Sequence, residues 1–294
     1  MLKLKGCFTA LITPFKNGGI DRPALEKIVR RQIAGGVSGL VPCGSTGETA
    51  TLSPEEYLEV IKLVVDAAGG KAPVVAGVGT NSTAKSVEMV KKILTLGVDG
   101  LLAVVPYYNK PTQSGLIAHF SEMARVTRLP IILYNIPGRT GVNMLPATVL
   151  ALRKKFPNII GIKEASGDLD QVSEIVSILD KGFAVMSGDD SLTLPMMSVG
   201  ARGVISVVSN LAPLETAKMC ALFSEGGTAK AAKIHHSLFP LVKKLFIETN
   251  PIPVKYAAYM LGLCAHEPRL PLTPLSAANR PALKKAMKAF GLIA

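Results

Sequence analysis

Eight short apolar runs constrain the fold more than any other feature of this sequence. Each run is rich in Val, Ile, Leu or Ala and precedes a longer stretch in which apolar residues recur at helical spacing. Continuous apolar runs are typical of parallel strands, because helices cover both faces of a parallel sheet. The predicted strands are residues 7–13, 39–43, 73–78, 100–105, 130–135, 159–163, 184–187 and 203–207.

The segments between these runs carry signals for the start of a helix. Asp21 precedes one apolar pattern, and Ser53 precedes a Pro at the first helical position of the next. Eight strand–helix units over about 225 residues match an α/β chain of the TIM-barrel, or (β/α)8, class. A doubly wound open sheet is disfavoured, because no Gly-x-Gly-x-x-Gly follows the first strand. We expect a barrel in residues 1–228 and an extension of three helices in residues 229–294.

Composition and spacing exclude several classes of protein. Apolar residues make up 48% of the chain and charged residues 18%, which excludes a disordered chain. No apolar run reaches the roughly 18 residues that a membrane span needs, and the first residues lack a signal-peptide pattern. A cytoplasmic protein without membrane attachment is therefore expected. The four cysteines lack Cys-x-x-Cys spacing and the four histidines lack metal-ligand spacing, so neither a metal nor another cofactor is expected.

The basic end of the chain has two interpretations. The last 68 residues hold ten Lys or Arg and two acidic residues, within a net charge of +12 for the whole chain. A non-catalytic barrel that binds nucleic acid through this segment is one possibility. The lysines are spread over helix-like stretches with few aromatic residues between them, which favours a solvated helix face and no nucleic-acid partner.

Reactive groups of a barrel enzyme lie at the carboxyl ends of the strands. The second predicted strand is followed by Gly-Ser-Thr-Gly-Glu, where Ser45 and Thr46 offer hydroxyls and backbone N–H groups for a carboxylate. An ordinary strand-to-helix turn is the alternative. The fourth strand is followed by Tyr107 and Tyr108, which can supply a phenol to the site or pack against a neighbouring subunit.

The next two strands complete a candidate site for carbonyl chemistry. The fifth ends at Tyr134, with Arg139 five residues later, which pairs a proton donor with a fork for a carboxylate. The sixth ends at Lys163, whose loss of solvation would favour the neutral, nucleophilic amine. For Lys163 alone, a salt bridge with Glu164 is the more usual arrangement. An amine, a phenol, hydroxyls and a guanidinium at one end of a barrel nevertheless suit Schiff-base chemistry.

These motifs resemble those of the pyruvate-dependent class I aldolases, the family that includes dihydrodipicolinate synthase and N-acetylneuraminate lyase. The resemblance spans essentially the whole chain. It is carried by residues 44–48, 134–137, 161–164 and 187–190. Within the family the chain is most similar to the dihydrodipicolinate synthases, on the strength of residues 106–111, 138–141 and 250–255. Arg139 is usually absent from the relatives that act on sugar acids, which remain the alternative.

The resemblance implies a lyase that condenses pyruvate with L-aspartate 4-semialdehyde on the diaminopimelate pathway to lysine. Lys163 would form the Schiff base with pyruvate. Tyr134 would relay protons with Ser45 and with Tyr108, which family members supply from an adjacent subunit. A homotetramer built as a dimer of dimers is implied as well.

The resemblance also assigns residues that bind the substrates. Backbone N–H groups of Ser45 and Thr46 would hold the pyruvate carboxylate, and Arg139 would hold the carboxylate of the semialdehyde. Gly188 and Ile205 match positions that line the pyruvate pocket.

This chain departs from its relatives at two places. Ser45 stands where most have threonine, so the hydroxyl remains but its rotamer is less restricted. Tyr57 and Lys85 stand where lysine-inhibited relatives carry His and Glu. A lysine at position 85 would repel the ammonium of free lysine, so we expect feedback inhibition to be weak or absent.

Overall fold

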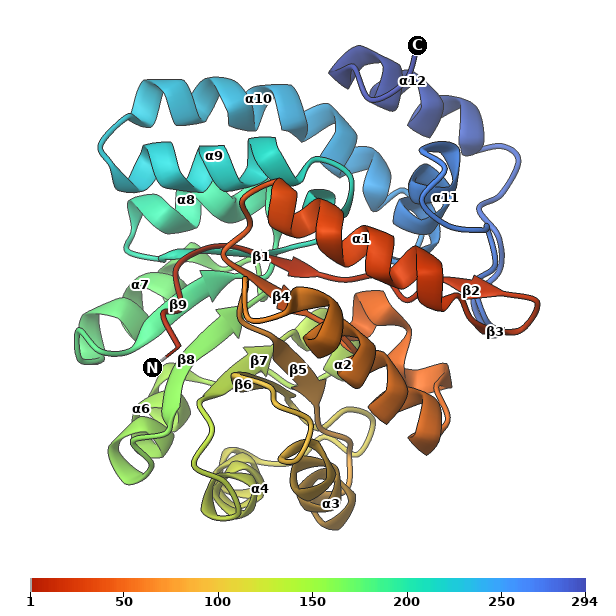
Figure 1. Cartoon of the computed structure of the whole chain (residues 1–294). Coiled ribbons are helices and arrows are strands. Elements are labelled where there is room, and N and C mark those ends of the chain that lie inside the picture. Colours follow the sequence, from red (N-terminus) through yellow and green to blue (C-terminus); the bar gives the residue numbers. More distant parts are fainter. Residues whose placement is uncertain (1) are drawn as a thin grey trace.

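Eight parallel strands form a closed barrel in the computed structural model, which describes residues 2–294 (Figure 1). Neighbours around the sheet follow the order β4-β1-β10-β9-β8-β7-β6-β5, and a parallel bridge from Leu40 to Val74 closes the ring. The predicted TIM barrel is therefore confirmed. The strands are β1 (Gly6–Ala10), β4 (Gly39–Val41), β5 (Val75–Val78), β6 (Gly100–Val104), β7 (Ile131–Asn135), β8 (Ile159–Glu164), β9 (Ala184–Ser187) and β10 (Gly203–Ser206).

Several strands are shorter than predicted. An apolar run indicates that residues are buried, but not that their backbone pairs with a neighbouring strand. Residues 11–13 remain buried after β1 ends. There the Ile12 N–H donates to Asn210 Oδ1 (3.2 Å) and the Thr13 hydroxyl donates to Gly47 O (2.7 Å). Side chains thus replace strand neighbours as hydrogen-bond partners. A short β-hairpin follows, in which β2 (Phe15–Lys16) pairs antiparallel with β3 (Gly19–Ile20). This hairpin was not predicted.

Helices surround the barrel, and the predicted start signals cap them. Asp21 accepts from the Ala24 N–H, and Ser53 forms a reciprocal capping box with Glu56. The helices that cover the strands are α1 (Arg22–Ala34), α2 (Pro54–Ala68), α3 (Thr83–Ile93), α4 (Gln113–Arg125), α6 (Pro146–Lys155), α7 (Leu169–Ile178), α8 (Thr193–Ser198) and α9 (Pro213–Ser224).

Two apolar layers hold this arrangement together. The larger lies between the strands and the helices. The smaller fills the barrel interior and includes Phe8, Leu102, Tyr134 and Ile205. Successive side chains of a strand point to opposite faces. Leu102 therefore belongs to the inner cluster, while Leu101 and Ala103 on either side of it belong to the outer one.

Three helices form the extension, as predicted: α10 (Thr228–Leu245), α11 (Ile252–Met260) and α12 (Arg280–Phe290). The predicted boundary after residue 228 falls at the start of α10 and stays a prediction. Most lysines of α10 and α12 lie on exposed positions, as expected for a solvated face. The irregular segment between α11 and α12 returns to the barrel, where its Arg269 contacts the loops after β2 and β4.

The four cysteines form no disulfide in the described residues. Cys7, Cys43 and Cys220 are buried and Cys264 is half-buried, all as free thiols. Within residues 2–294, no three His, Cys, Asp or Glu side chains are grouped to hold a metal ion. None of the helices in this range is long and apolar enough to cross a membrane.

Candidate active site

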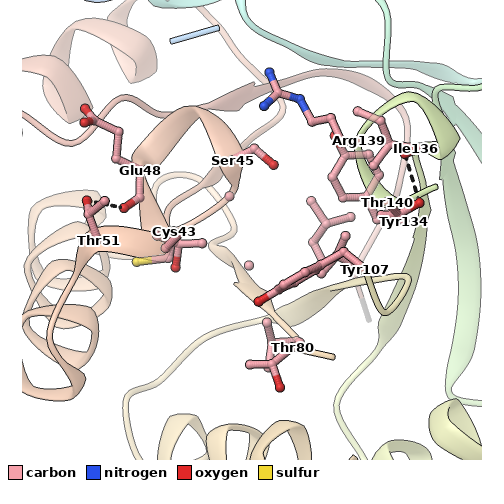
Figure 2. A pocket seen from close by; sticks show the side chains of 18 of the residues that line it. Cys43, Ser45, Glu48, Thr51, Thr80, Tyr107, Tyr134, Ile136, Arg139 and Thr140 are labelled. Carbon is pink, nitrogen blue, oxygen red and sulfur yellow. Dashed lines mark hydrogen bonds between the residues drawn. The ribbon is translucent and has the colours of Figure 1, made fainter. Parts of the chain in front are cut away.

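A cavity of about 470 Å³ opens at the carboxyl ends of the strands, where barrel enzymes carry their active sites (Figure 2). Loops after β4, β5, β6 and β7 form most of its wall, and the ends of β5, β6 and β7, Met89 of α3 and the C-terminal extension complete it. The polar side chains of the wall include Ser45, Thr51, Thr80, Tyr107, Tyr134, Arg139, Thr140 and Asn250.

Lys163 and Tyr134 lie side by side because β7 and β8 pair them in register. The Lys163 Nζ lies 4.3 Å from the centroid of the Tyr134 ring, and that ring lines the cavity. Only 5% of Lys163 is exposed. The lysine therefore places a buried amine against the face of the Tyr134 ring, which brings together the two groups that imine chemistry uses.

The structure excludes the salt bridge between Lys163 and its neighbour Glu164. Adjacent residues of a strand point to opposite faces, and the buried Glu164 carboxylate accepts hydrogen bonds elsewhere. Its donors are Asn135 Nδ2 (3.0 Å), the Ser166 N–H (2.7 Å) and Gln171 Nε2 (3.1 Å). Among residues 2–294 no carboxylate forms an ion pair with Lys163. The Lys163 amine therefore has no carboxylate partner within this part of the chain.

Gly188 borders the lysine, and Ile205 lies in the apolar layer inside the barrel. A Cβ added at Gly188 would lie 3.0 Å from Lys163 Cε and 2.6 Å from Ala165 Cβ, so a side chain there would displace the amine. Ile205 is fully buried on β10 and belongs to the same inner cluster as Tyr134. Gly188 therefore lies next to the reactive group, and a role for Ile205 in the pyruvate pocket stays a prediction.

The loop after β4 brings the two adjacent hydroxyls to the cavity edge. Ser45 lines the cavity, and Ser45–Gly47 form a 3-10 turn whose first N–H groups have no partner within the turn. The Thr46 hydroxyl accepts a hydrogen bond, since Asn250 Nδ2 donates to Thr46 Oγ1 at 3.0 Å. This bond uses only a lone pair of the hydroxyl, so the O–H and the backbone N–H of Thr46 both remain donors for a substrate carboxylate.

Glu48 anchors this loop from behind. It adopts a left-handed backbone (φ 52°), and in Figure 2 its side chain points away from the cavity. Its carboxylate accepts from Lys255 Nζ (2.5 Å) and from the Arg269 N–H (2.9 Å). Burial lowers the pKa of Lys255, while Glu48 acts in the opposite direction. A buried ion pair therefore fixes the loop that carries Ser45 and Thr46.

Arg139 reaches the cavity from the short helix α5 (Pro137–Thr140), which directly follows β7. One guanidinium N–H donates to Asn250 O at 2.9 Å. A guanidinium has five N–H donors, so others remain for a substrate carboxylate. Figure 2 shows Arg139 above Tyr134, on the side that faces Ser45.

The adjacent residues Tyr107 and Tyr108 lie in different environments. Tyr107 lines the cavity, whereas Tyr108 is 87% exposed and lies outside the cavity of its own chain. The structure thus brings together Ser45, Tyr134 and Arg139 around the cavity and places Lys163 beside them, but not Tyr108. A role for Tyr108 in the site of a neighbouring subunit stays a prediction.

Comparisons with known proteins identify the family of the chain. The model of the dihydrodipicolinate synthetase family matches residues 3–290. The chain belongs to this family. The 4-hydroxy-tetrahydrodipicolinate synthase of Endomicrobium trichonymphae is 51% identical over 288 residues, which cover 98% of this chain and 99% of that protein.

Solved structures of the same family superimpose over nearly the whole chain. The synthase from Methylacidiphilum fumariolicum SolV has 48% identity and a TM-score of 0.97, covering 98% of this chain and 96% of its own. A chloride-inhibited synthase from Acinetobacter baumannii, complexed with pyruvate, has 42% identity and a TM-score of 0.96, covering 99% and 100%. The prediction of a dihydrodipicolinate synthase-type enzyme is confirmed.

Sequence reasoning missed three residues that shape this family member's site. Asn250, Lys255 and Arg269 all come from the extension and all hold the loop after β4 or Arg139. In the sequence, residues 250–255 contributed only to the resemblance. An asparagine directly followed by Pro251 was the one available signal.

Proposed function

We propose that this enzyme condenses pyruvate with L-aspartate 4-semialdehyde, as a 4-hydroxy-tetrahydrodipicolinate synthase. The observation that carries the proposal is the desolvated amine of Lys163, free of any ion pair in the described chain and 4.3 Å from the Tyr134 ring. The same cavity offers Arg139 for a second carboxylate.

The first half of the reaction takes place at Lys163. Its amine adds to the pyruvate ketone and water leaves, which gives an imine. Loss of a methyl proton converts the imine to an enamine. Tyr134, with Ser45 and Tyr108 of an adjacent subunit, relays these protons. Backbone N–H groups at Ser45 and Thr46 bind the pyruvate carboxylate, and Gly188 and Ile205 enclose the pyruvate.

The second half joins the two substrates. The enamine carbon attacks the aldehyde, while Arg139 holds the carboxylate of the semialdehyde. The amine of that substrate then attacks the imine carbon, and the bond to Lys163 breaks with return of a proton to Nζ. The ring is thereby closed and the lysine is regenerated.

Truncation of Arg139 tests the choice of the second substrate. We expect Arg139→Ala to lower kcat/KM for L-aspartate 4-semialdehyde by about 100-fold, because a charged pair to the carboxylate is lost. Trapping of the pyruvate imine by borohydride should continue. Arg139→Lys, which keeps the charge without the fork, should recover only part of the loss. Undiminished activity of Arg139→Ala, or cleavage of a sugar acid by the wild type instead, would favour the sugar-acid aldolases.

Feedback inhibition by lysine is expected to be weak. The Tyr57 side chain is buried and its hydroxyl donates to Gly77 O (2.7 Å), while Lys85 places a cation on the surface helix α3. Neither residue attracts the ammonium of free lysine. Steady-state rates should change little at submillimolar lysine, and Lys85→Glu should increase the sensitivity. Half-inhibition of the wild type in that range would contradict the expectation.

We also propose assembly as a homotetramer of tight dimers in the cytoplasm. The exposed Tyr108 supports the assembly, because an exposed phenol at the rim of one cavity is available to another subunit. A monomeric variant should then have low activity.

A further inference from the structure

One acceptor of the cavity wall has no hydrogen-bond partner. Among residues 2–294, five buried side-chain polar atoms lack a partner, and of these only the Oδ1 of Asn250 belongs to a residue that lines the cavity. Asn250 is 6% exposed. A buried acceptor without a donor is unfavourable in a folded protein, so this atom is available to a ligand.

The rest of Asn250 is fixed from two sides. Its Nδ2 donates to Thr46 Oγ1 at 3.0 Å, and its backbone carbonyl accepts from Arg139 at 2.9 Å. The residue therefore joins the group that binds the pyruvate carboxylate to the group that binds the second carboxylate. Its free oxygen belongs to the same residue that holds the Arg139 guanidinium.

We propose that Asn250 Oδ1 accepts a hydrogen bond from the α-amine of the second substrate and so selects an amino-acid aldehyde. This inference rests on the proposed function. An α-amino acid carries its amine and its carboxylate on one carbon. The site offers a matching pair, an acceptor on Asn250 and a guanidinium on Arg139, and these two residues are hydrogen-bonded to each other. A substrate with hydrogen in place of the amine leaves the acceptor unpaired, which is a strong basis for discrimination.

A neutral acceptor suits the later chemistry better than a carboxylate. Glu48 is the acidic residue of the cavity wall, but its side chain points away from the cavity, and its two oxygens accept from Lys255 Nζ and the Arg269 N–H. A free carboxylate would stabilise the ammonium form, which has no lone pair for ring closure. An amide oxygen orients the amine and lets it lose its proton.

The test compares two ligands that differ only in the amine. With saturating pyruvate, kcat/KM is measured for L-aspartate 4-semialdehyde, and the inhibition constant is measured for 4-oxobutanoate, which lacks the amine. In Asn250→Ala we expect kcat/KM for the amino-acid aldehyde to fall about 10- to 100-fold. The inhibition constant of 4-oxobutanoate should change less than about threefold, because its carboxylate still binds Arg139.

Control variants separate recognition from positioning. Thr46→Val removes the partner of Asn250 Nδ2 but leaves Oδ1, so it should alter both ligands to a similar extent. Asn250→Asp, nearly identical in shape, should keep the preference for the amine and move the pH optimum of kcat upward. Equal losses for both ligands in Asn250→Ala, or an unshifted optimum in Asn250→Asp, would overturn the proposal. A wild type that does not consume the semialdehyde would instead refute the proposed function.

Discussion

Replacement of Lys163 by alanine is expected to lower kcat by at least about 10³-fold, because no other group in the site can form the imine. The amine lies 4.3 Å from the Tyr134 ring and only 5% of the residue is exposed. Lys163→Arg keeps the cation but cannot form the same imine, so it should be similarly inactive. Partial recovery by the arginine variant would indicate an electrostatic role instead.

Chemical trapping identifies the residue directly. Borohydride reduction of the wild type with pyruvate should add one pyruvate-derived group to the peptide that contains Lys163, as measured by mass spectrometry. Lys163→Ala should trap none. Lys285→Ala, at an exposed position of α12, is the matched control and should trap as the wild type does. Trapping at another lysine, or at none, would refute the mechanism.

Replacement of Lys255 by methionine is expected to lower the free energy of unfolding by about 3–5 kcal/mol. Neither side chain of the Lys255–Glu48 pair is exposed to solvent, and Lys255 also donates to Glu267 O (2.9 Å). Loss of the cation leaves Glu48 as a buried, uncompensated charge at the base of the Ser45 loop. Catalysis should therefore decline along with stability, through a raised KM for pyruvate.

A double-mutant comparison separates the pair from simple loss of packing. Glu48→Gln in the Lys255→Met background should restore part of the lost stability, because the orphaned charge is removed. Arg30→Met breaks the exposed pair with Glu26 and should change the free energy of unfolding by no more than about 0.5 kcal/mol. Urea unfolding at fixed protein concentration measures all three. A loss below about 1 kcal/mol for Lys255→Met would contradict a structural role for the pair.

The fold was predictable because its signals are local. Strands buried on both faces give continuous apolar runs, and helix starts need only a capping side chain such as Asp21 or Ser53. The position of Lys163 at a strand end followed from the same pattern. Whether its amine was free was not predictable, since a neighbouring glutamate is the usual partner of such a lysine.

The sequence by itself determined the order of the eight strand–helix units and the end of the barrel at which Lys163, Tyr134 and Ser45 lie. Only the tertiary structure decided that Asn135 and Gln171 hold the Glu164 carboxylate and that Tyr108 lies outside its own cavity. It also decided that Asn250 reaches Thr46 from a position 204 residues later in the chain. Apolar periodicity and capping act over a few residues, whereas these contacts arise from packing between segments far apart in the chain, which no local pattern encodes.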